Sequence, residues 1–103
     1  MSVPLATDRP LLAAMWADLA NIQARFVEQQ ALFAPHYTTM HIIAERIQNL
    51  NMQCVALAMV DKNYKGHSAD GDRRLDTAEE KLLSDMAAFK TQLTTFYAVA
   101  GVV

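Results

Sequence analysis

Residues 40–64, MHIIAERIQNLNMQCVALAMVDKNY, carry a long helical pattern. Apolar side chains recur there at steps of three and four, interrupted only at Asp61, which aligns them along one side of a helix. These residues are Met40, Ile43, Ile47, Leu50, Cys54, Leu57 and Tyr64. The pattern predicts a helix over about residues 36–65 that turns one face toward a core.

Similar patterns on either side predict two more helices. The first spans about residues 8–33, with Thr7 or Asp8 as its N-cap, and is broken by Pro35 because the ring disfavours helical geometry in the preceding residue. Its apolar stripe is Leu12, Met15, Leu19, Ile22, Phe26 and Phe33. The third spans about residues 76–100, where Asp76 with Glu79, or Thr77 with Glu80, provides a capping box. Its stripe is Leu82, Met86, Phe89, Leu93, Phe96 and Ala100, with Gly101 as the stop.

These elements fit a single helical domain over residues 1–103. Three Gly and three Pro leave little room for the turns of an all-β fold. Helices of similar length with short connections are typical of bundles, and their near-heptad stripes favour shallow crossing angles. We therefore predict an all-α, antiparallel three-helix bundle with up-down-up topology, which associates into a larger helical bundle.

Composition also bounds the function. The net charge is −2, which argues against a dominant electrostatic attraction to nucleic acid or to anionic lipid. The single cysteine, Cys54, excludes an internal disulfide framework and fits a reducing compartment. We find no secretory signal pattern and no apolar run of the roughly 20 residues that span a bilayer. A cytoplasmic protein without membrane contact is expected.

A second apolar stripe lies on the middle helix. In residues 52–60 only Gln53 is polar, so Met52, Val55 and Met59 form a stripe beside the one that faces the core. Apolar residues make up 52% of the chain and charged residues 19%, against roughly 45–50% and about 25% in typical soluble domains. This surplus predicts a self-association or partner surface at Met52, Val55 and Met59, with Trp16 of the first helix beside it. The alternative is that the middle helix is central and its neighbours cover both of its sides.

Residues 68–79 resemble an EF-hand calcium loop. Counted from Ser68, the acidic residues Asp70, Asp72, Asp76 and Glu79 stand at positions three, five, nine and twelve, which supply hard oxygen ligands. Position one is Ser68 and position six is Arg73, where the family has an aspartate and a glycine. The resemblance implies a metal-responsive module as an alternative function, with calcium as its ion. The competing interpretation is a solvated connector followed by the capping box.

Other candidate sites have weaker patterns. His41 and Glu45 share a helix face but lack the paired motif of di-iron bundles, and Cys54 reads as a small buried hydrophobe. The basic residues of the second connection are interleaved with acids, which is typical of a solvated loop and leaves a small nucleic-acid-binding regulator as a third, unfavoured function. These basic residues are Lys62, Lys65, Arg73 and Arg74.

No Gly-rich phosphate loop, nucleophile elbow or Cys-x-x-Cys pair is present, so we do not expect an enzyme or a cofactor. The sequence favours a non-enzymatic helical protein-interaction module, such as an adaptor, a chaperone or an inhibitor. The expected partner is a second copy, another protein, or both.

Overall fold

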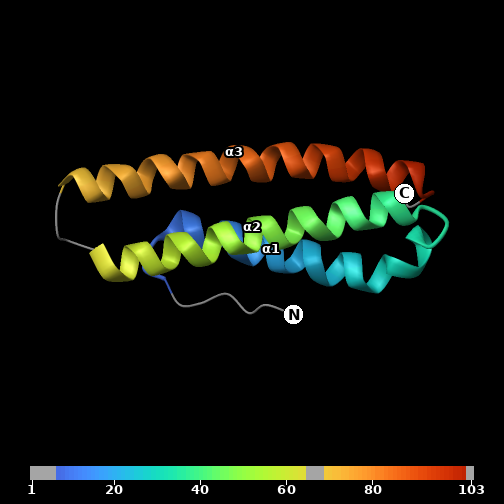
Figure 1. Ribbon diagram of the computed structural model, residues 1–103, viewed down its shortest axis with the longest axis horizontal. Coiled ribbons are helices and arrows are strands. Elements are labelled where there is room, and N and C mark those ends of the chain that lie inside the picture. Colours follow the sequence, from blue (N-terminus) through green and yellow to red (C-terminus); the bar gives the residue numbers. More distant parts are fainter. Residues whose placement is uncertain (1–6, 65–68, 102–103) are drawn as a thin grey trace.

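A computed structural model describes residues 7–64 and 69–101, apart from the side chain of Tyr64. It contains the α-helices α1 (Pro10–Gln29), α2 (Tyr37–Tyr64) and α3 (Ala69–Val99), with a short 3-10 helix, η1 (Gln30–Phe33), between α1 and α2. The three α-helices pack against one another along the long axis of the molecule (Figure 1). The described ranges contain no strand, and the predicted all-α class is confirmed.

The first helix starts and ends slightly inside its predicted bounds. Pro10 occupies the first turn, where its missing N–H costs no hydrogen bond, and the N-cap is therefore Arg9 rather than Thr7 or Asp8. At the other end the helix tightens into η1. An α-helix would need a donor at Pro35 for the carbonyl of Ala31, but proline has none, and the Ala34 N–H donates to that carbonyl instead at 3.2 Å.

The third helix begins earlier than predicted, at Ala69 rather than Asp76. The Asp70 carboxylate accepts from Arg74 at 3.0 Å and lies 3.5 Å from Arg73, and both pairs support the helix along its own surface. Leu75 is only 3% exposed, so this first stretch also contributes to the core. Neither predicted capping box starts the helix, because Asp76, Thr77, Glu79 and Glu80 all lie inside α3.

The predicted stripes build the core. Its buried members from these stripes are Leu12, Met15, Leu19, Phe26, Phe33, Ile43, Ile47, Leu50, Cys54, Leu57, Leu82, Met86, Phe89 and Leu93. Phe33 brings η1 into this core, with its ring centroid 5.8 Å from that of Phe26 and 5.3 Å from that of Tyr97. Gly101 adopts a positive φ of 81° just after α3, which confirms it as the helix stop.

Arg9 ties the start of α1 to α3. Its guanidinium donates to both carboxylate oxygens of Glu79, at 3.1 and 3.2 Å, and also pairs with Asp76. The hydrogen bonds to Glu79, followed by those to Asp76, raise the pKa of Arg9 above its ordinary value despite the opposing effect of burial. Asp76 and Glu79, which the sequence pattern assigned to a helix cap, therefore form ion pairs with Arg9 of another segment instead.

Within the described residues, no helix is both long enough and apolar enough to cross a lipid bilayer.

Candidate protein interface

The clearest surface feature is an apolar patch on the second half of α2. Met52, Met59 and Val60 are 64%, 54% and 43% exposed, and Ala56 between them is exposed as well. The same stretch turns Cys54, Leu57 and Ala58 into the core. This part of α2 is therefore apolar toward both the core and the solvent.

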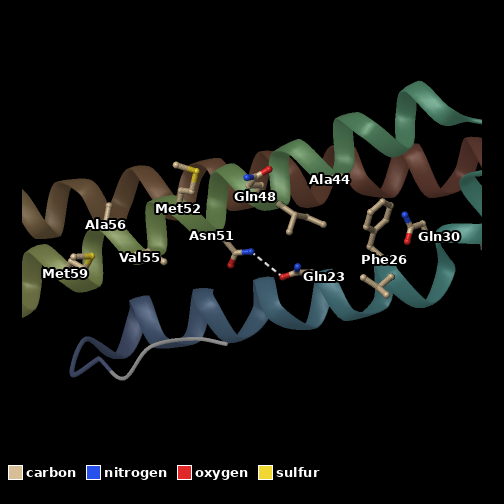
Figure 2. Close-up of a pocket in the computed structure, with 12 residues that line it drawn as sticks. Gln23, Phe26, Gln30, Ala44, Gln48, Asn51, Met52, Val55, Ala56 and Met59 are labelled. Atoms are coloured by element: carbon tan, nitrogen blue, oxygen red, sulfur yellow. Dashed lines mark hydrogen bonds between the residues drawn. The ribbon is translucent and has the colours of Figure 1, made fainter. Parts of the chain in front are cut away.

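A groove of about 750 Å³ runs beside this patch, between α1 and α2. Figure 2 shows α1 and α2 forming its two walls. The lining residues are Gln23, Phe26, Val27, Gln30, Ala44, Ile47, Gln48, Asn51, Met52, Val55, Ala56 and Met59. None of these described side chains carries a charge, so the groove selects for apolar and neutral polar groups rather than for ions.

Two predicted interface residues, Met52 and Met59, lie at the surface of this groove, and Val55 is half-buried against the core. Val27, 57% exposed, adds an apolar side chain from the α1 wall. We call Val27, Met52, Val55 and Met59 the α1–α2 face.

Trp16 does not belong to this face. It is only 1% exposed and lies in the core, which corrects the prediction that it borders the partner surface. The reason is its size: a position beside the main stripe of α1 still lets the indole reach the interior. Its Nε1–H has no hydrogen-bond partner among the described residues.

The sequence patterns missed a polar pair at the base of the groove. The Asn51 side-chain amide donates to Gln23 Oε1 at 3.3 Å, and Asn51 is only 8% exposed (Figure 2). Asn51 follows Ile47 by four residues, which is a signal that it faces inward, but nothing in the sequence identifies Gln23 as its partner. A buried polar group needs such a partner, and this hydrogen bond between α1 and α2 satisfies the Asn51 amide.

A smaller trough of about 290 Å³ lies on the other side of the apolar patch, between α2 and α3. Ala56 and Val60 form part of one wall, and Arg74 and Lys81 belong to the other. Both cations already pair along α3, Arg74 with Asp70 and Lys81 with Asp85 at 2.9 Å. This trough is therefore smaller than the α1–α2 groove, and its lining includes two charged side chains, whereas that of the groove includes none.

The predicted calcium loop is helical instead. Asp70, Asp72, Asp76 and Glu79 all lie within α3, and Ser68 lies outside the described residues. A calcium loop wraps its ligands around the ion, whereas a helix spreads them around its circumference. In addition, Glu79 and Asp76 already form ion pairs with Arg9. The described part of the chain contains no group of three His, Cys, Asp or Glu side chains arranged to hold a metal ion.

The remaining candidates take structural roles. His41 Nε2 lies 2.8 Å from the Tyr37 hydroxyl, and the two rings meet edge to face at 4.6 Å. Cys54 is fully buried, and burial raises the pKa of its thiol to about 11, which keeps it protonated at neutral pH. Among the predicted basic residues, Arg73 and Arg74 face Asp70, Lys62 is exposed, and Lys65 lies outside the described residues.

Comparisons of this chain with protein-family models, with curated proteins and with solved structures find no match. The functional argument therefore rests on the groove and the apolar patch themselves.

Proposed function

We propose that this chain is a non-enzymatic helical protein-interaction module with up-down-up topology, and that it forms a homodimer through the α1–α2 face. One observation carries the proposal: the second half of α2 exposes Met52, Met59 and Val60 although the core already has its own apolar stripe. Burying an apolar side chain contributes about 1.5–3 kcal/mol relative to leaving it in water. Association that covers this patch is therefore favoured over leaving it exposed to water.

The chemistry of the groove suits a helix from another protein molecule. An amphipathic helix binds a groove by placing apolar side chains one turn apart along its floor. Methionine adapts to such side chains because its thioether is unbranched and polarisable. The groove lining is also uncharged, so two copies can bring the same face together without placing like charges in contact.

The test is the solution mass of the chain over a concentration series, by light scattering or sedimentation. We expect the natural chain to form dimers and Met59→Glu to shift the mass toward the monomer, because a carboxylate would enter the apolar contact. Leu83→Glu is the matched control: Leu83 is 45% exposed but lies on α3, outside the groove. Unchanged circular dichroism would show that the helices remain. A natural chain that stays monomeric throughout the series, or a Met59→Glu mass equal to the natural one, would refute the homodimer.

A further inference from the structure

The outer side of α2 carries a regular seam that lies outside the core, apart from the half-buried Val55. Steps of three and four connect Glu45, Gln48, Met52, Val55, Met59 and Lys62, and we call these residues the outer seam. All are exposed except Val55, which is half-buried. This spacing is that of alternating a and d positions in a coiled coil, in which such a seam packs against another helix.

Residues at equal distances from the centre of the outer seam have side chains of similar size. The two end residues, Glu45 and Lys62, have opposite charges. When a helix packs against an antiparallel copy of itself, each residue meets the residue at the same distance on the other side of the centre. Met52 then shares a layer with Val55 of the second copy, and Gln48 shares one with Met59 of the second copy. At the ends, the acid Glu45 meets the base Lys62, and this pair occurs twice in the dimer.

The parallel alternative brings like charges together. It places Glu45 beside Glu45 and Lys62 beside Lys62, and like charges at facing positions are destabilising. The antiparallel arrangement replaces both contacts with attractive pairs. Charge complementarity therefore identifies both the occupant of the seam, a second copy of α2, and its direction.

We propose that two copies of the chain pair through antiparallel α2 helices, with Glu45 and Lys62 setting the register. The α1 wall supports this geometry, because Gln23 and Val27 line the same groove as Met52 and Val55 and would contact the incoming helix. By the two-fold symmetry, each α2 lies against the α1–α2 groove of the other copy. This inference rests on the proposed homodimer and adds its orientation.

Charge reversal at the two ends tests the register. Glu45→Lys alone and Lys62→Glu alone each turn both attractive pairs into repulsive ones, and we expect the dimer dissociation constant to rise roughly tenfold in each case. The doubly reversed chain, E45K/K62E, restores opposite charges and should return to within about twofold of the natural constant. An equimolar mixture of the two single variants should also associate like the natural chain, because every end pair is then attractive. In a parallel dimer neither single reversal would weaken association, since one like-charged pair only replaces another.

Disulfide trapping gives a second, independent reading. The double variant Gln48→Cys with Met59→Cys should form a covalent dimer on oxidation, whereas Gln48→Cys alone should not. Within one chain these two positions lie three turns apart on the same helix and cannot bridge. Cys54 does not interfere, because it is fully buried. If the natural chain is dimeric but Gln48→Cys alone also cross-links, the antiparallel register is wrong while the homodimer stands. If the natural chain is monomeric, both proposals fail.

Discussion

The two halves of α2 differ in the side chains that they expose to solvent but are alike in the apolar side chains that they bury. Between residues 41 and 49 the exposed side chains are polar apart from Ala44; the polar ones are His41, Glu45, Gln48 and Asn49. Between residues 52 and 60 the outer side chains are apolar and equally open to solvent: Met52, Ala56, Met59 and Val60. One helix of the same bundle therefore presents a solvated surface along its first half and an uncovered apolar surface along its second.

The inner sides show no such difference. Ile43 and Ile47 in the first half, and Cys54 and Leu57 in the second, are all buried in the same core. Both halves therefore contribute to the core in the same way, although their outer residues differ. The buried side chains of the second half do not include Met52 or Met59, and we propose that these two methionines serve association.

The largest expected effect comes from truncating a buried side chain in each half of α2, which tests whether both halves contribute equally to stability. Ile47→Ala and Leu57→Ala should each lower the free energy of unfolding by about 2–5 kcal/mol, because both remove a buried branched side chain and leave a cavity. Urea unfolding followed by circular dichroism, at one fixed protein concentration, measures both losses. A Leu57→Ala variant as stable as the natural chain would mean that the second half of α2 is not held by the core, and the comparison would lose its basis.

The pH dependence of stability sharpens the same point at Cys54. Burial raises its pKa to about 11 from its ordinary value of 9.0, so the folded state favours the neutral thiol. This stabilising contribution is fully present below pH 9.0 and is lost as the pH rises through about 11. The full loss should be about 3 kcal/mol, since the pKa rises by about two and each pKa unit corresponds to about 1.4 kcal/mol.

The measurement compares the natural chain with Cys54→Ala in urea unfolding between pH 8 and pH 11. The variant lacks the thiol but keeps the other groups that titrate there, so its stability should fall less steeply. Parallel curves for the two proteins would show that the thiol is not held in an apolar site.

Much of this architecture follows from periodicity alone. The inner stripe of α2 was predictable because spacing by three and four reports which side of a helix is apolar. Its members Ile43, Ile47, Leu50, Cys54 and Leu57 are buried. The exposed positions of Met52 and Met59 followed from the same logic, because they form a second stripe that the core does not need. Helix periodicity is a local property of the sequence, and it predicts correctly which of these α2 side chains are buried and which are exposed.

The errors arose where distant residues decide. Asp76 and Glu79 match a helix cap in sequence, but Arg9, far away along the chain, pairs with both inside α3. Trp16 looked peripheral because its angular position lies beside the stripe, yet its side chain is long enough to be buried. The Asn51–Gln23 hydrogen bond joins two helices, so no window of sequence contains both partners.

A direct exchange between the two outer surfaces should have a smaller effect, and on association rather than folding. Met52→Gln makes the second half resemble the first and should weaken the dimer about tenfold, since it removes an exposed apolar side chain from the contact. Its monomer stability should change by no more than about 0.5 kcal/mol, because Met52 is 64% exposed in the single chain. Sedimentation equilibrium measures the first quantity and urea unfolding the second. A large loss of stability would instead place Met52 in the fold's own packing.

The smallest effect should come from Asn51, which lies beside the boundary between the two halves. Asn51→Leu removes the hydrogen bond to Gln23 and buries an apolar side chain in its place, while Gln23, which is only half-buried, can turn to water. Exchanging a buried polar pair for apolar contact is often neutral or favourable, and we expect the free energy of unfolding to rise by about 1 kcal/mol. Asn49→Leu, two residues earlier and on the exposed side, should change it by less than about 0.5 kcal/mol and serves as the matched control. If Asn51→Leu were instead destabilising by several kcal/mol, the amide pair would be holding α1 against α2. The uncharged groove would then depend on that one hydrogen bond for its shape.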